Sequence, residues 1–158
     1  MSHDFNVDEV FEMAEQVERN GAKFYRDAAL NIDDEGAKKL LNEFAEMEDE
    51  HEKTFAALRS ELKDGDKQRT VFDPEGESAL YLRALADTRV FFKKEIDTTS
   101  LKEILKAALT AEKDSIVFYL GMKDLVPEKL GKDKIDHIIR EEMGHIKLIG
   151  GKLKAFKV

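Results

Sequence analysis

The sequence predicts an all-α protein, a four-helix bundle made of two helical hairpins that a long crossover joins. Four long stretches carry apolar residues at three- and four-residue spacing, the period of an amphipathic helix. The chain contains only two Pro, and 38% of its residues are charged, which suits long helices with solvated outer faces. A length of 158 residues predicts one domain, residues 1–158, with a core of its own.

The first predicted hairpin consists of helices at about 7–30 and 35–63. A short turn connects them, in which Asp33 or Asp34 can cap the second helix. Because the turn is short, the two helices should pack as antiparallel neighbours. The apolar stripe predicted for the first helix consists of Val10, Met13, Ala14, Val17, Gly21, Phe24 and Ala28.

The second predicted hairpin consists of helices at about 100–125 and 134–156. Ser100 and Glu103 have the spacing of a capping box at the start of the third helix, and Pro127 follows its end. The stripe predicted for the third helix is Leu101, Ile104, Leu105, Ala108, Ala111, Ile116 and Leu120. The stripe predicted for the fourth is Ile135, Ile138, Ile139, Met143, Ile146 and Ile149.

The segment at about 65–99 breaks this pattern and is predicted to be the crossover. It opens on Gly65 and contains the turn signal Asp73-Pro74, with a short helix expected between 77 and 90. A connection of this length is too long for a hairpin turn. It is long enough to run back along a bundle and join the two hairpins.

Composition excludes several classes of function. A net charge of −8 without a Lys/Arg cluster argues against nucleic acid or an anionic membrane as a partner. The absence of Cys excludes disulfides, thiolate zinc sites and Cys-ligated iron–sulfur or rubredoxin-type centres. No signal peptide and no apolar run near the roughly 20 residues of a membrane span are present, so a cytoplasmic location is expected.

A Glu-x-x-His motif occurs twice, at Glu48/His51 and at Glu142/His145. Residues three apart on a helix lie on one face, so each Glu and His can project together. One such motif is weak evidence in a chain rich in Glu. An internal repeat makes it specific, because an offset of 94 residues relates the following pairs: Glu18 and Glu112, Tyr25 and Tyr119, Glu48 and Glu142, His51 and His145.

These six acidic and imidazole side chains predict a dinuclear metal site. A Glu from each of two helices and a Glu-x-x-His from each of the other two is the ligand pattern of di-iron carboxylate bundles. Four carboxylates carry a charge of −4, which balances two divalent cations. Without metal they would repel one another in a bundle core. Carboxylate oxygens with one nitrogen per metal suit Fe or Mn, and Zn is chemically possible.

The same residues carry a resemblance to a known family. Residues 18–25, Glu48-x-x-His51, residues 112–119 and Glu142-x-x-His145 resemble the rubrerythrin and bacterioferritin side of the ferritin-like superfamily, over nearly the whole chain. The resemblance implies two iron ions in a ferritin-like bundle. It implies terminal ligands Glu18 and His51 for one metal, terminal ligands Glu112 and His145 for the other, bridging ligands Glu48 and Glu142, and hydrogen-bonding tyrosines Tyr25 and Tyr119.

Four departures from the family narrow the expected function. No Cys-ligated rubredoxin domain is present to deliver electrons. Rubrerythrins carry a further Glu where this chain has Ser115, and bacterioferritins carry a haem-ligating Met where it has Asp49, so haem is not expected. The sequence stops at Val158, directly after the fourth predicted helix, and ferritins use a short fifth helix in cage assembly, so a storage cage is not expected. The resemblance is therefore to a stand-alone rubrerythrin-like domain.

The leading functional hypothesis is oxidation of a ferrous di-iron centre by hydrogen peroxide or dioxygen, in oxidative-stress defence or iron handling. It would need an external electron donor, such as a rubredoxin-type protein, and the resemblance favours a homodimer. One alternative is a non-catalytic metal-binding, sensing or docking bundle with the same site. Another is an oxygenase acting on an organic substrate.

Other chemically capable side chains have simpler interpretations. His137 is expected at the surface and not as a ligand. The carboxylates expected on solvated helix faces are Glu15, Glu46, Glu50, Glu52 and Glu141. The methionines expected to fill the core are Met13, Met47, Met122 and Met143.

Overall fold

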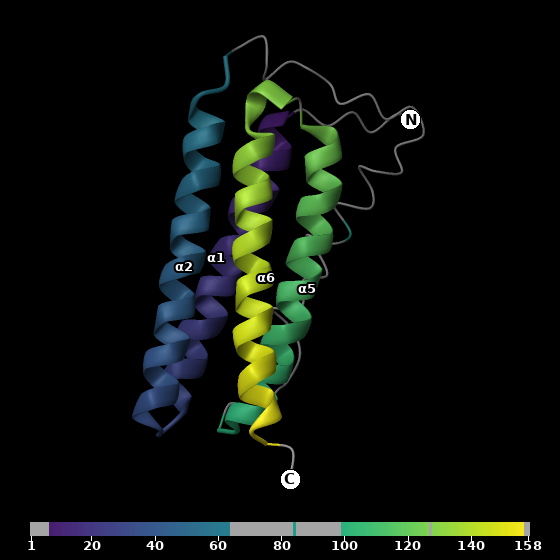
Figure 1. Cartoon of the computed structure of the whole chain (residues 1–158). Helices are drawn as coiled ribbons and strands as arrows, with labels where there is room; N and C mark the ends of the chain where they lie inside the picture. The colour runs from purple at the N-terminus through teal and green to yellow at the C-terminus, as the bar shows by residue number, and fades with distance from the viewer. Residues whose placement is uncertain (1–6, 64–83, 85–98, 127, 157–158) are drawn as a thin grey trace.

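Four long helices lie side by side in the computed structural model, which describes residues 7–63, 84, 99–126 and 128–156 (Figure 1). The helices are α1 (Val7–Asn31), α2 (Glu35–Ser60), α5 (Leu101–Leu125) and α6 (Lys132–Lys154), with the 3₁₀ turn η2 (Glu128–Leu130) before α6. Each predicted helix boundary agrees with the observed one to within a helical turn. The predicted all-α four-helix bundle is confirmed.

The helices form two antiparallel hairpins, α1 with α2 and α5 with α6 (Figure 1). The C-terminal end of α2 and the N-terminal end of α5 lie at opposite ends of the bundle, as the predicted crossover requires. The predicted crossover and the short helix predicted within it fall almost entirely outside the described residues. None of the described helices combines the length and the apolar character that a membrane crossing requires.

Side-chain caps start two of the helices where the sequence predicts them. Asp34 is the N-cap of α2, and its carboxylate accepts a hydrogen bond of 2.7 Å from the Ala37 N–H. Ser100 is the N-cap of α5, and its hydroxyl accepts a bond of 3.3 Å from the Glu103 N–H. Such caps satisfy N–H groups that the first turn of a helix leaves without partners.

The apolar core is divided into two clusters along the bundle axis. One cluster contains the buried apolar residues between positions 7 and 17 of α1 with Phe55, Phe118 and Ile138, and the other contains Tyr25, Phe44 and the buried apolar residues between positions 104 and 111. Every helix runs from one cluster to the other. Between the clusters each helix contributes buried polar residues, namely Glu18, Glu48, His51, Glu112, Ser115, Glu142 and His145. A polar layer therefore crosses the middle of the bundle.

Three residues that the sequence analysis placed in the core are instead exposed. Met47, Leu120 and Met143 keep 37%, 49% and 54% of their surface exposed. Each follows or precedes an inward-facing residue by one position and so points about 100° away from it around the helix. Conversely, Phe11 was omitted from the predicted stripe of α1 and is fully buried. Met122 is buried and Met13 is partly buried, as predicted.

Glu15 was predicted on a solvated face and is buried. Its carboxylate lies 2.9 Å from the Arg59 guanidinium, which also donates to Asp8 at 2.8 Å. Arg59 lies near the end of α2, beside the start of α1, because the two helices are antiparallel. A charge partner from the neighbouring helix therefore lets Glu15 be buried.

Gly131, the residue before α6, has a φ of 115°, which favours glycine. A Cβ built there would lie 2.8 Å from Leu58 Cδ2. Gly131→Ala should therefore lower the free energy of unfolding by at least about 1 kcal/mol, through backbone strain and the forced shift of Leu58. Denaturant unfolding of the protein would measure this difference.

Gly151→Ala is the matched control, since Gly151 lies inside α6 with open space around its Cα. Helix propensity predicts a gain of up to about 1 kcal/mol for this change. Equal effects of the two substitutions would contradict the proposed role of the left-handed backbone.

Candidate metal centre

All six predicted ligand side chains meet in the polar layer at the middle of the bundle. None is more than 2% exposed. Glu18 comes from α1 and Glu112 from α5, while α2 and α6 each contribute one Glu-x-x-His pair. In each pair the three-residue spacing directs both side chains inward, as the sequence predicts.

The six residues form two overlapping groups. One consists of Glu18, Glu48, His51 and Glu142, and the other of Glu48, Glu112, Glu142 and His145. Within each group, one potential ligand atom per residue lies within 4.8 Å of all the others. Glu48 and Glu142 belong to both groups, the positions expected of bridging ligands. The arrangement indicates a site for two metal ions.

Both histidines direct Nδ1 toward the carboxylates. His51 Nδ1 lies 2.9 Å from Glu142 Oε1 and 3.5 Å from Glu18 Oε2. His145 Nδ1 lies 3.4 Å from Glu112 Oε1 and 3.9 Å from Glu48 Oε1. The imidazole nitrogen facing the centre is therefore the same in both halves of the site.

The centre contains buried polar atoms that make no hydrogen bond of acceptable geometry. Within the described part of the chain they are Glu18 Oε2, Glu48 Oε1, His51 Nδ1, Glu112 Oε2, both carboxylate oxygens of Glu142 and His145 Nδ1. All seven belong to the six predicted ligands. Buried polar atoms are almost always satisfied, so this concentration calls for a missing partner. Cations held by oxygen and imidazole nitrogen would satisfy all of them, so the residues present fit two metal ions.

Without a cation, burial and repulsion between neighbouring carboxylates disfavour the charged forms of the two shared glutamates. Burial raises the pKa of Glu48 and Glu142 well above the ordinary value, and neighbouring carboxylates raise it further. Burial also acts to raise the pKa of Glu112, but contacts with Glu142 and His145 outweigh burial and lower it. Burial and mutual repulsion therefore favour the protonated form of the two shared glutamates when no metal is bound.

Burial and the neighbouring carboxylates act in opposite directions on the pKa of the His51 imidazole. Burial acts to lower its pKa, but contacts with Glu142 and Glu18 outweigh that effect and raise the pKa far above the ordinary value. A buried imidazole surrounded by carboxylates takes the role of a cation when no metal is present.

The two tyrosines of the repeat bond across the site. Tyr25 on α1 donates from its hydroxyl to Glu112 Oε1 on α5 at 2.6 Å, and Tyr119 on α5 donates to Glu18 Oε1 on α1. Burial and the adjacent carboxylates raise the pKa of both phenols well above the ordinary value, so both remain hydrogen-bond donors. Each tyrosine orients the outer glutamate of the opposite hairpin and leaves its second oxygen facing the centre.

Two residues at the outer side of the histidines were missed by the sequence analysis. Glu141 was predicted to be solvated, but its Oε2 lies 2.5 Å from His51 Nε2. Met47 Sδ lies 3.3 Å from His145 Nε2. The signal that could have found them is their position directly before each Glu-x-x-His. His137 is exposed, as predicted, and its Nε2 pairs with Glu141 Oε1 at 2.7 Å.

Ser115 adds no ligand to the centre. Its buried hydroxyl donates to the Ala111 carbonyl of the same helix at 3.0 Å. Rubrerythrins carry a further Glu at this position. In this chain the side chain there is instead hydrogen-bonded to the backbone of its own helix.

Comparison with known proteins identifies a solved structure with a similar fold. The chain is similar to a crystal structure from Thermotoga maritima described as a candidate ferritin-like diiron-carboxylate protein, with a TM-score of 0.71 and 22% sequence identity over 98% of each chain. No protein-family model and no curated protein matches the chain. The likeness shows that the bundle has the ferritin-like fold, as the ligand repeat led us to expect.

The raised pKa values of Glu48 and Glu142 predict how the metal-free protein responds to pH. Above about pH 4.5 the carboxyls of the unfolded chain lose their protons, whereas the raised pKa values favour the protonated forms of these two in the folded state. Unfolding then releases protons, so the free energy of unfolding should fall as pH rises, by up to about 1.4 kcal/mol per pH unit for each fully linked proton. Thermal unfolding in chelator between pH 5 and about pH 8 measures this.

Glu142→Gln is the control, because it removes one of the titrating groups that link stability to pH and a contact that raises the pKa of His51. The variant should show a shallower decline than the wild type in the same buffers. A wild-type stability that rises over this range would contradict the assignment.

Glu48→Ala should abolish paired metal binding, because Glu48 belongs to both ligand groups. At Zn²⁺ concentrations about 100 times the dissociation constant, the wild type should gain about 2.7 kcal/mol per bound ion. The variant should bind fewer than two ions per chain and lose most of that gain. Without metal it should be at least as stable as the wild type at neutral pH, because repulsion between carboxylates is relieved.

Metal counting after gel filtration and thermal unfolding with and without Zn²⁺ give both quantities. Glu43→Gln is the matched control, since Glu43 is an exposed carboxylate of the same helix outside both ligand groups. Equal metal content in the wild type and Glu48→Ala would refute the assignment.

Proposed function

We propose that this ferritin-like bundle binds two iron ions and oxidises them from the ferrous state with hydrogen peroxide or dioxygen. The observation that carries the proposal is the pair of overlapping ligand groups that share Glu48 and Glu142. Shared carboxylates hold two cations close enough to act on one small molecule. Together with the sequence resemblance, that arrangement supports the proposal of a rubrerythrin-like peroxidase or ferroxidase role, in oxidative-stress defence or iron handling.

The donor set supports iron over most other metals. Each group offers three carboxylates and one imidazole nitrogen, and the described centre contains no thiolate because the chain has no Cys. Such a set suits iron or manganese and also accepts zinc. Iron bound there would supply the one-electron chemistry that reduction of peroxide or dioxygen requires and that zinc lacks.

The protein's own residues would prepare the site for that chemistry. Tyr25 and Tyr119 hold the outer glutamates in fixed orientations by hydrogen bonds from opposite hairpins. The apolar clusters on both sides keep bulk water away from the buried carboxylates. A dry site strengthens the hold of charged ligands on cations and limits side reactions. The phenol hydroxyls also lie where a proton or an electron could be passed to a ligand carboxylate.

Repeated turnover would require electrons from outside the chain. Reducing one hydrogen peroxide to two waters consumes two electrons and two protons. The absence of Cys excludes a rubredoxin-type centre within this sequence. We therefore propose a separate electron-donor protein of the rubredoxin type. We also propose a homodimer as the working assembly, on the basis of the family resemblance.

The test is anaerobic loading with ferrous iron, followed by mixing with limiting hydrogen peroxide or dioxygen. The wild type should bind two irons per chain and oxidise them faster than the same concentration of free ferrous iron, with two irons consumed per peroxide. The relative rates would identify the preferred oxidant. Absorbance in the near ultraviolet follows the oxidation.

Glu142→Ala serves as the site-deficient control and Glu43→Gln as the surface control. Bound iron that reacts with neither oxidant faster than free iron would overturn the redox proposal. The absence of Cys favours a second candidate in that case, a metal-binding bundle with the same dinuclear site but without turnover.

A further inference from the structure

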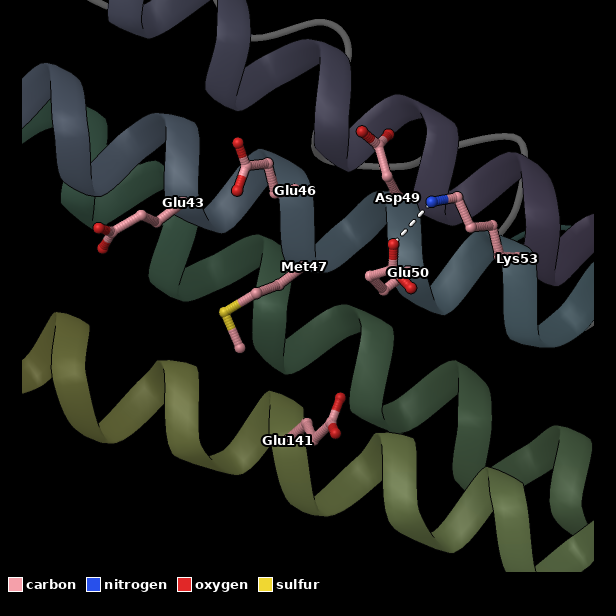
Figure 2. A pocket seen from close by; sticks show the side chains of 7 residues that line it. All are labelled: Glu43, Glu46, Met47, Asp49, Glu50, Lys53 and Glu141. Atoms are coloured by element: carbon pink, nitrogen blue, oxygen red, sulfur yellow. Dashed lines mark hydrogen bonds and ion pairs between the residues drawn. The ribbon is translucent and has the colours of Figure 1, made fainter.

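A pocket of about 670 Å³ opens on the surface between α2 and α6. Its lining is mainly acidic and consists of Glu43, Glu46, Met47, Asp49, Glu50, Lys53 and Glu141. Figure 2 shows Met47 extending from α2 toward α6 and Glu141 extending from α6 toward α2. Glu50 and Lys53 pair with each other at 2.6 Å, away from the other two.

Two residues that line the pocket, Met47 and Glu141, contact histidines of the candidate metal centre. Glu141 Oε2 lies 2.5 Å from His51 Nε2, and Met47 Sδ lies 3.3 Å from His145 Nε2. Both contacts join a residue of one hairpin to a histidine of the other. Each histidine therefore has its inner nitrogen in the ligand layer and its outer nitrogen against a pocket residue.

Met47 and Glu141 occupy equivalent positions of the internal repeat. They are separated by the same 94 residues that relate Glu48 to Glu142 and His51 to His145. The repeat matches in all six candidate ligands and both tyrosines, yet it differs at the residue that contacts the outer nitrogen of each histidine. One histidine has a carboxylate neighbour and the other has a thioether.

These two neighbours act differently on an imidazole that binds metal. When Nδ1 holds a cation, the ring proton is on Nε2 and is donated outward. A carboxylate accepts that proton in a strong, charge-assisted hydrogen bond, which fixes the tautomer and makes the ring a better donor to the cation. A thioether sulfur is a weak acceptor and does neither to the same degree.

We propose that the two metal positions are unequal, and that Glu141 makes the position formed by Glu18 and His51 the first to fill. Glu141 is a positioning residue that acts through His51. The position formed by Glu112 and His145, whose histidine faces Met47, fills second. This inference rests on the metal-binding part of the proposed function and is independent of its redox part.

The experiment adds one equivalent of Zn²⁺ to the metal-free protein and locates the ion by anomalous scattering in crystals. Zn²⁺ is redox-inactive, so the result does not depend on oxidation chemistry. Outer hydrogen-bond partners of metal ligands typically change affinity 10- to 100-fold. The first ion should therefore occupy the Glu18/His51 position in about 90% or more of the molecules. Calorimetric titration measures the two dissociation constants in solution.

Variants at positions 47 and 141 test the cause of the inequality. Glu141→Met gives both histidines a thioether neighbour, so one equivalent of Zn²⁺ should distribute about equally. The double variant Met47→Glu/Glu141→Met exchanges the two neighbours, so the first ion should move to the Glu112/His145 position. Glu141→Gln keeps the size of the side chain and should give an intermediate distribution.

Glu46→Gln is the matched control, because it removes one negative charge from the same pocket at a residue outside the two histidine contacts. It should leave the order of filling unchanged. Equal occupancy in the wild type, or an unchanged order in the exchanged double variant, would overturn the inference. Failure to bind two ions at all would instead refute the proposed metal site.

Discussion

Four carboxylates buried in the middle of an otherwise apolar bundle are the constraint on which the rest of this structure depends. Their charge has to be compensated, and the arginines of the first hairpin do not do it. Arg19 pairs with Glu52, Arg26 with Asp49 and Arg59 with Asp8 and Glu15, all in the outer parts of α1 and α2. The inner carboxylates are left with two histidines and each other, so protons or metal ions must supply the remaining positive charge.

The fold divides the site evenly between its two hairpins, yet neither hairpin holds a complete half. Glu18 and His51 come from the first hairpin, but the shared Glu142 comes from the second. The tyrosine bonds also cross, from each hairpin to the outer glutamate of the other. Metal binding would therefore stabilise the docking of the hairpins, and the two apolar clusters above and below the polar layer set the register in which they dock.

The fold and the six candidate ligands could be predicted from the sequence, because helical period and motif spacing are properties of one helix at a time. The same reasoning misplaced Glu15 in solvent, because its burial depends on a neighbour in another helix. Glu15 is buried because Arg59 reaches it from α2. The contact of Glu141 with His51 joins α6 to α2, so the position of Glu141 before its own motif marks it as a candidate but does not show which histidine it contacts.

The structure also gives a physical reason why the repeat matches at the ligands and differs at positions 47 and 141. The ligands are at most 2% exposed, and replacing one with an apolar residue would remove a donor atom, and for a glutamate also a negative charge that balances the bound cations. Met47 is 37% exposed and the Glu141 side chain 36%, so a thioether and a carboxylate can both be accommodated there beside water. Positions that contact a ligand from a partly exposed site can therefore change the properties of one metal position and leave the ligand set intact, whereas a change at a ligand removes a donor from the site.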